Sequence, residues 1–198
     1  MDLDVSRETR SRLDRFSTLL LRWNRTVNLI AHKDEPHIWQ RHITDSLQLI
    51  PLIPPATPRA IDLGTGGGFP GLVLAVATQI PFDLIEPDQR KAAFLREAIR
   101  ATGATASVHT VRAEHAVQTP ASLVTSRALA PLPRLLRLAT PLLAPDGICL
   151  FLKGANVDSE LTATAAEWHM QVTRVPSQTA PDACILRISS IARVLSHP

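Results

Sequence analysis

The stretch AIDLGTGGGFPGLVLAVA, residues 60–77, constrains the fold of this chain more than any other feature. Its apolar start predicts a short strand that ends at Asp62 and Leu63. Pro70 then opens an apolar run with the length of a helix. Four glycines lie between the strand and this helix, at Gly64, Gly66, Gly67 and Gly68. Glycine adopts positive φ angles and lets a ligand approach the main chain, so this order is typical of a nucleotide-binding turn in a parallel sheet.

The rest of the chain alternates between the same two kinds of element. Short apolar runs predict strands at residues 59–63, 82–86, 107–111, 122–126 and 148–153. Helical patterns separate them, at residues 71–79, 89–101 and 132–143. A further helix at 157–169 and an antiparallel hairpin of 170–175 with 184–192 close the chain. This alternation predicts the α/β class, with a parallel sheet covered by helices on both faces.

The first fifty residues have a different pattern. Apolar residues at helical spacing predict an amphipathic helix over 6–30, and a second helix from Asp34 to Ile50 with Pro36 in its first turn. The following PLIPPATP, residues 51–58, cannot continue a helix, because each proline lacks a donor and restricts the residue before it. We therefore expect a helical extension over residues 1–55 and a second domain over residues 56–198.

Composition excludes several classes of protein. With 45% hydrophobic and 20% charged residues among 198, the chain is typical of a globular protein that folds without disulfides or a structural metal. Cys149 and Cys184 lack metal-ligand spacing, which predicts two reduced buried thiols, no metal and a cytosolic location. The mixed charges of the first ten residues argue against a secretory signal, and no apolar run has the length of a membrane span. The net charge of +3 permits an anionic partner but does not require one.

Two ligand classes use a glycine turn of this kind. The dinucleotide fingerprint has a third glycine where this chain has Phe69. We expect the carboxylate of Asp62 to face the pocket, where it suits the cationic amino-acid group of S-adenosylmethionine better than a diphosphate. Glu86 ends the second strand and is predicted to accept hydrogen bonds from ribose hydroxyls, a role that both ligand classes share. A tight turn with no ligand remains the structural alternative.

Seven motifs occur together in a recognisable order and spacing: WNRTVNL, RHITDSL, IDLGTGGGFPG, EPDQRKAAFL, RAE, TSRALAPL and FLKG. With them the chain resembles the glucose-inhibited division protein B family, the bacterial guanine-N7 methyltransferases of small-subunit ribosomal RNA. The resemblance implies a Rossmann-like, seven-stranded S-adenosylmethionine-dependent methyltransferase fold with an N-terminal helical extension. It also implies methylation of a single guanine in 16S rRNA, the substrate being the rRNA, the small ribosomal subunit or an assembly intermediate. Nothing in the sequence demands a partner subunit, so we expect a cytoplasmic monomer.

The resemblance also implies site residues. The cofactor positions of the family fall on Gly64, Phe69, Ala113, Glu114 and Arg127. The strand-end argument adds Asp62, Gly66, Gly68 and Glu86. For contact with RNA, we expect basic side chains around the mouth of the pocket, the candidates being Arg22, Arg25, Arg41, Arg127, Arg134, Arg137 and Lys153.

The chemistry needs few side chains. Guanine N7 has a free lone pair and no proton to lose, so methyl transfer requires alignment and no general base. We therefore assign no catalytic residue and expect Arg127 to orient the base, with a surface ion pair as its structural alternative. Arg41 and Asp45, one turn apart, are predicted to form an ion pair. Methylation of another RNA or of a small molecule, nicotinamide-dependent redox chemistry and simple nucleotide binding are the alternatives that the sequence leaves open.

Overall fold

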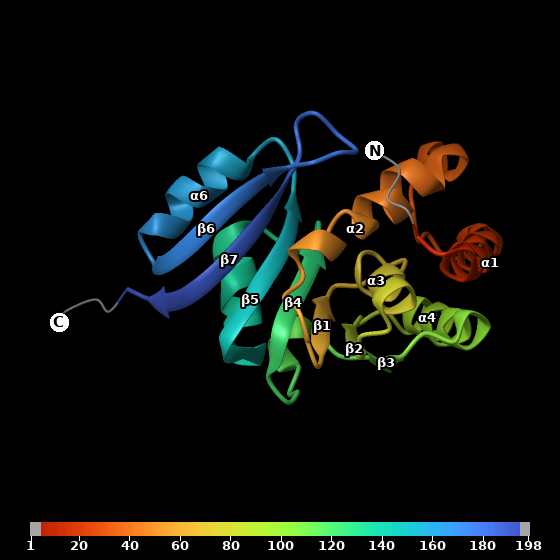
Figure 1. Ribbon diagram of the computed structural model, residues 1–198, viewed down its shortest axis with the longest axis horizontal. Helices are drawn as coiled ribbons and strands as arrows, with labels where there is room; N and C mark the ends of the chain where they lie inside the picture. Colours follow the sequence, from red (N-terminus) through yellow and green to blue (C-terminus); the bar gives the residue numbers. More distant parts are fainter. Residues whose placement is uncertain (1–4, 195–198) are drawn as a thin grey trace.

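The computed structural model describes residues 5–194 and contains a single seven-stranded sheet (Figure 1). The strand order is β3-β2-β1-β4-β5-β7-β6. All neighbouring strands are parallel except those that pair with β7, which is antiparallel to both β5 and β6. The strands are β1 (Ala60–Leu63), β2 (Phe82–Ile85), β3 (Ala106–His109), β4 (Ala121–Arg127), β5 (Leu143–Lys153), β6 (Trp168–Pro176) and β7 (Cys184–Arg193). The predicted α/β class and the closing hairpin are confirmed.

Helices cover both faces of the sheet. The α-helices are α1 (Arg7–Asn24), α2 (Asp45–Leu47), α3 (Gly71–Thr78), α4 (Gln89–Thr102), α5 (Leu132–Ala139) and α6 (Val157–Ala165). Shorter 3-10 and π segments are η1 (His32–His37), η2 (Trp39–Thr44), η3 (Ile50–Leu52), η4 (Ala113–His115) and η5 (Thr140–Leu142). One apolar core joins α1, α3 and α4 to the sheet, and a second joins α5 and α6 to its other face (Figure 1).

Several predicted boundaries are wrong. The helix expected over 132–143 ends at Ala139, and the helix expected over 157–169 ends at Ala165, because β6 already begins at Trp168. Three others differ for local reasons. α1 ends at Asn24 rather than residue 30, because the Asn24 carboxamide accepts hydrogen bonds from the amides of Leu29 and Ile30 and stabilises the turn. The expected regular second helix is divided into η1, η2 and α2, with Pro36 inside the 3-10 segment. β5 begins at Leu143, five residues before the predicted start, where it pairs with Ala121.

The N-terminal segment packs into the core of the sheet. Leu13 and Phe16 are fully buried, and the Phe16 ring lies 5.5 Å from that of Phe69 and 6.2 Å from that of Phe94. The Arg12 side chain donates to the carbonyls of Thr102 and Gly103 at the end of α4, where a cation complements the exposed carbonyls. Residues 5–55 therefore share the core of the parallel sheet, and the domain boundary at residue 55 stays a prediction.

Two further observations concern thiols and membranes. Cys149 and Cys184 are buried free thiols, as predicted, and burial raises the pKa of Cys149. No helix within residues 5–194 combines the length and the apolar character that crossing a bilayer requires.

Candidate functional site

The glycine turn joins β1 to α3 at the carboxyl edge of the sheet. Gly64, Gly66 and Gly68 have φ angles of +68°, +57° and +97°, which side chains with a Cβ rarely adopt. The amides of Gly64 and Thr65 donate to the Ile85 carbonyl at the end of β2. These three glycines are therefore required by the backbone of the turn.

Glu86 lies directly beside this turn, as the sequence predicts. One carboxylate oxygen accepts from the amide of Gly66 at 2.8 Å and the other from the amide of Asp88 at 2.9 Å. Asp88 in turn caps α4 by accepting from the amides of Arg90 and Lys91. Glu86 thus fixes the glycine turn to the start of α4, a structural role that the sequence reasoning missed.

Asp62 does not face a pocket, which corrects the prediction. Its side chain is fully buried, and Thr125 Oγ1 donates to Oδ1 at 2.7 Å. Among the described residues, nothing donates to Oδ2, which lies against Gly71. Successive side chains of a strand point to opposite faces, and Asp62 shares the face of Ala60, beneath α3. Burial raises the pKa of Asp62 to about 6, although the Thr125 hydrogen bond opposes this shift.

The Phe69 ring contacts both a histidine and an arginine. The His42 ring stacks on it with a centroid separation of 4.9 Å, and the Arg127 guanidinium lies 5.0 Å from its centroid. Within the described part of the chain, neither ring nitrogen of His42 has a hydrogen-bond partner, and Nε2 lies 3.6 Å from Asp34 Oδ2. Burial, with Arg127 as a second cause, lowers the pKa of His42 to about 4. His42 is therefore a neutral ring at pH 7.

The pKa shifts of Asp62 and His42 predict opposing effects of pH on the free energy of unfolding. The folded Asp62 binds its proton more tightly than the unfolded one, so its contribution to the free energy of unfolding falls by up to about 3 kcal/mol as pH rises from 4 to 6. The folded His42 binds its proton less tightly, so its contribution rises over pH 4 to 6.5. Urea unfolding across this range measures both. Relative to wild type, Asp62→Asn should gain stability as pH rises and His42→Gln should lose it; parallel curves would contradict the two assignments.

Arg127 ends β4 and connects three segments. Its Nη1 donates to Asp45 Oδ2 and to the Arg41 carbonyl, both at 3.2 Å. Asp45 Oδ1 accepts from Thr179 at 2.5 Å and from Gln48 at 2.8 Å. The predicted ion pair of Arg41 with Asp45 is wrong: Arg41 pairs with Asp34 at 3.1 Å, because η2 is not a regular α-helix and Asp45 is held by Arg127.

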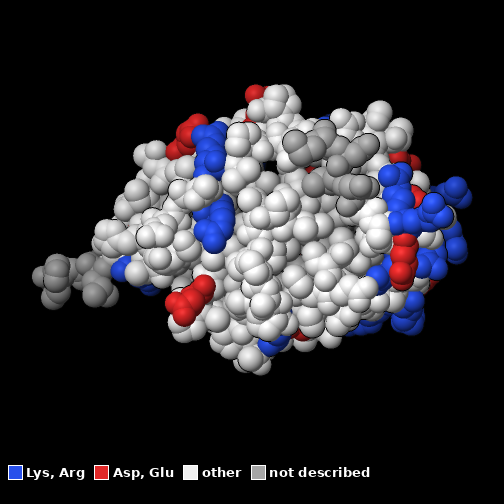
Figure 2. All heavy atoms as spheres, viewed as in Figure 1, with Lys and Arg blue, Asp and Glu red and all other residues white. Residues whose placement is uncertain are grey.

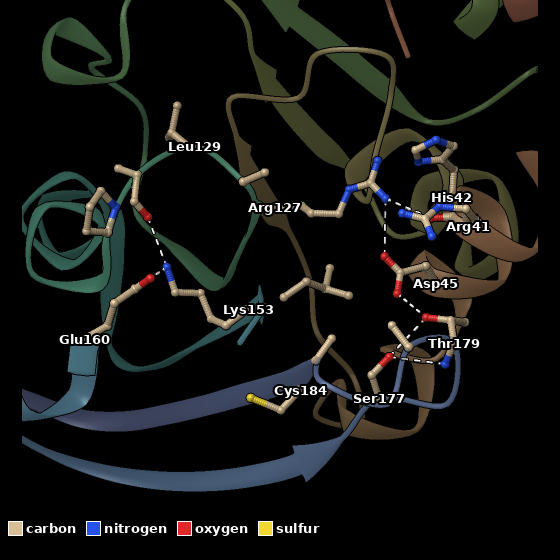
Figure 3. Close-up of a pocket in the computed structure, with 17 residues that line it drawn as sticks. Arg41, His42, Asp45, Arg127, Leu129, Lys153, Glu160, Ser177, Thr179 and Cys184 are labelled. Atoms are coloured by element: carbon tan, nitrogen blue, oxygen red, sulfur yellow. Dashed lines mark hydrogen bonds and ion pairs between the residues drawn. The ribbon is translucent and has the colours of Figure 1, made fainter. Parts of the chain in front are cut away.

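A large cavity of about 680 Å³ lies beside Arg127 at the carboxyl edge (Figure 3). Its walls come from η2, the loop after β4, the end of β5, α6 and the turn between β6 and β7. Lys153 and Glu160 face the cavity from the side across from Arg127 (Figure 3). The polar side chains in its wall are Arg41, His42, Asp45, Arg127, Lys153, Glu160, Ser177 and Thr179. A volume of this size falls within the range of about 300 to 1,000 Å³ that small-molecule sites occupy.

A small cavity of about 140 Å³ adjoins the glycine turn and includes Gly64, Ala113 and Glu114. It shares Leu129 and Ala130 with the large cavity. Leu129 Cδ1 lies 2.7 Å from the place where a Cβ on Gly64 would be, so this side chain covers the bare backbone of the turn. The small cavity holds only part of a nucleoside ligand, and the remainder would extend past Leu129 toward the large cavity. The glycine turn suits such a ligand, because Gly64 has no side chain of its own between the main chain and the cavity.

The structure gathers some of the predicted residues and separates others. Gly64, Ala113, Glu114, Arg127, Arg41, Arg134 and Lys153 contribute to the two cavities. Asp62, Gly66, Gly68, Phe69 and Glu86 lie outside both linings. Arg22 lies in the last turn of α1 and Arg25 directly follows that helix, and Arg137 pairs with Glu167 beside β6 at the other edge of the sheet. Leu129 entered the sequence analysis only as part of the TSRALAPL motif, and the wall residues Glu160, Ser177 and Thr179 carried no signal, because loops and chain crossings bring them together.

Comparisons with known proteins agree on one family. A family model described as rRNA small subunit methyltransferase G matches residues 9–185. The protein of that name from Acidiphilium cryptum is 56% identical over 205 residues, covering 96% of this chain and 94% of the relative. Its namesake from Granulibacter bethesdensis is 54% identical over 190 residues, covering 96% of this chain and 89% of the relative.

Solved structures agree on the fold. An O-methyltransferase from Bacillus cereus, in complex with SAH, superposes with a TM-score of 0.61 at 14% identity, covering 88% of this chain and 90% of that one. The mitomycin 7-O-methyltransferase MmcR gives a TM-score of 0.61 at 16% identity, covering 80% and 58%. The fold is that of the S-adenosylmethionine-dependent methyltransferases, and the chain belongs to the rRNA small subunit methyltransferase G family.

Proposed function

We propose that this chain transfers a methyl group from S-adenosylmethionine to N7 of one guanine in 16S rRNA. The observation that carries the proposal is the adjacency of two cavities across Leu129, one at the glycine turn and one large enough for a base. A donor bound at the turn and an acceptor in the large cavity would meet at this residue. The membership of the chain in the methyltransferase G family supports the choice of small-subunit rRNA.

S-adenosylmethionine, when bound, supplies an electrophilic methyl group on a sulfonium. The chain would hold it by the main chain at Gly64, by the segment of Ala113 and Glu114, and by Glu86, whose carboxylate already borders the turn. Its own residues then need only align the acceptor, because N7 carries a lone pair and no proton. Arg127 is fixed by Asp45 beside the cavity and would orient the base.

The acceptor base would have to enter the large cavity unpaired. The chain has 4% aromatic residues and no tyrosine, so stacking platforms are few. Figure 2 shows one face, on which Lys and Arg gather over α1 and α4 and in a shorter column over β6 and β7, with a wide uncharged area between. Contact with the RNA backbone at these two places and capture of a displaced base between them would suit recognition by shape.

The direct test measures the product. Purified protein is incubated with S-adenosylmethionine and either unmethylated 16S rRNA or small subunits, and the digested RNA is analysed by mass spectrometry for 7-methylguanosine. Product at a single position is expected. Failure with naked RNA, subunits and assembly intermediates alike would refute the proposal, and methylation of another RNA or of a small molecule would replace it. Stabilisation against heat by S-adenosylhomocysteine and not by NAD excludes the oxidoreductase alternative.

Gly64→Ala is expected to lower the affinity of the protein for its cofactor. A Cβ at this position would meet Leu129 Cδ1 at 2.7 Å on a backbone with φ of +68°, and it would occupy the approach to the main chain. We expect the Kd for S-adenosylhomocysteine, measured by calorimetry, to rise about tenfold or more. Gly103→Ala at the end of α4 is the matched control, because its φ is +63° but nothing lies within 4 Å of the added Cβ. Equal affinity of both variants would contradict the placement of the cofactor.

A further inference from the structure

Lys153 and Glu160 form an ion pair on the wall of the large cavity, with Nζ 2.5 Å from Oε2 (Figure 3). The side chain of Lys153 is 8% exposed and that of Glu160 is 22% exposed. Lys153 Nζ also donates to the Ala130 carbonyl at 3.0 Å, and Glu160 Oε2 accepts from the Leu132 amide at 2.7 Å. The pair is therefore held in place by the loop that follows β4 and by the first residue of α5.

The charges around this cavity compensate one another. Arg41 pairs with Asp34, Arg127 with Asp45 and Lys153 with Glu160. A phosphate group would add a negative charge beside carboxylates that already neutralise these cations. A neutral ring with both donors and acceptors on its edge is the better match for the cavity, since ion pairs offer both kinds of group.

Guanine has the edge that such a pair can read. Its O6 is an acceptor, and the neighbouring N1–H and N2 amino group are donors that point the same way. An ammonium beside a carboxylate presents the complementary order, donor next to acceptor. Adenine carries a donor where guanine has O6 and an acceptor at N1, so it mismatches both groups. Because O6 lies between N1 and N7 on the perimeter of the base, contacts to O6, N1 and N2 leave N7 free to react.

Two ion pairs beside the cavity, Arg127 with Asp45 and Lys153 with Glu160, differ in the carboxylate oxygens that the described residues leave without a partner. Asp45 is occupied on both oxygens, by Thr179 and Gln48 on Oδ1 and by Arg127 on Oδ2. Both contacts of Glu160 are made by Oε2, and none of the residues 5–194 donates to Oε1. The protein thus occupies both oxygens of Asp45, whereas Oε1 of Glu160 is left as an acceptor for a ligand.

We propose that Glu160 and Lys153 determine the specificity for guanine. Glu160 accepts hydrogen bonds from N1–H and the N2 amino group, and Lys153 donates to O6. This inference rests on the proposed function and names the groups that select its acceptor base. Glu160 acts in recognition and takes no proton from the base, because the N7 reaction releases none from the ring.

The test uses inosine, which is guanosine without the N2 amino group. Wild type is given 16S rRNA with guanosine or inosine at the target position, and kcat/KM for each methylated product is measured by mass spectrometry. Inosine loses a hydrogen bond to a charged acceptor, so we expect its kcat/KM to be lower than that of guanosine by about tenfold or more. In Glu160→Gln the ratio of guanosine to inosine should fall below about threefold. Asp158→Asn, an exposed position on the same helix that pairs with Arg174, should keep the wild-type ratio.

The outcomes separate the two proposals. Absence of 7-methylguanosine with the guanosine RNA counts against the proposed function itself. Product formation with equal rates on guanosine and inosine in wild type overturns only the role of Glu160, and so does an unchanged ratio in Glu160→Gln. Thermal melting checks the fold of each variant. If Glu160→Gln does not fold, Glu160→Asp, which withdraws the carboxylate by one methylene group, takes its place and must lower the ratio.

Discussion

Replacing Arg127 with alanine is expected to lower kcat/KM for methyl transfer by about 100-fold. The guanidinium donates to Asp45 and to the Arg41 carbonyl and lies against the Phe69 ring, so one side chain orders the wall of the large cavity. Its removal leaves the Asp45 carboxylate, 14% exposed, without its cation. Breaking one partner of a poorly solvated pair costs more than the pair contributes, because the other charge stays behind.

The control for this experiment is Arg174→Ala. Arg174 pairs with Asp158 at 2.7 Å, but the two side chains are 48% and 79% exposed, so the change should leave the stability close to wild type. Arg174 lies on β6 and would supply only one of several contacts with the RNA backbone, so kcat/KM should fall far less than in Arg127→Ala. Arg127→Lys keeps the charge and loses the planar fork, and it should recover only part of the activity. Full activity in Arg127→Ala would mean that Arg127 is a structural residue with no part in the reaction.

Gly71→Ala is expected to destabilise the fold by about 3 kcal/mol, which for a chain of this length lowers the melting temperature by about 6 to 12 °C. Gly71 opens α3 directly above Asp62, and an added Cβ would lie 2.4 Å from the Asp62 Cβ and 2.6 Å from Oδ2. Asp62 is fully buried on a central strand and cannot withdraw without moving the sheet. Denaturant unfolding and calorimetry measure the loss.

Gly154→Ala is the matched control for Gly71. It follows β5, its φ is not in the left-handed region, and nothing lies within 4 Å of an added Cβ. We expect its free energy of unfolding to stay within about 0.5 kcal/mol of wild type. A melting temperature for Gly71→Ala equal to that of Gly154→Ala would show that α3 can move away from β1 at little cost.

Much of the fold follows from the spacing of apolar residues within each element, which does not depend on contacts with distant parts of the chain. The alternation of short apolar runs with helical patterns predicted the parallel strands and the closing hairpin, because each element carries its own apolar pattern. The carboxamide of Asn24 ends the first helix early, and Pro36 lies in a 3-10 segment where a regular second helix was expected. Neither effect shows in the periodicity of apolar residues. Gly64 and Glu86 lie at the ends of β1 and β2, where the predicted strands place them, but only Gly64 lines a cavity, and the role of both residues in binding a cofactor stays a prediction.

The sequence by itself determined the α/β class, the glycine turn and the family, since these rest on local patterns and on motifs in order. Only the tertiary structure decided which side chains line the two cavities. Asp62 points beneath α3 because of the face of the strand that it occupies, while Arg127, Asp45 and Thr179 meet across 134 positions of chain. Strand register and the crossing of loops set these contacts, and no spacing along the chain encodes them.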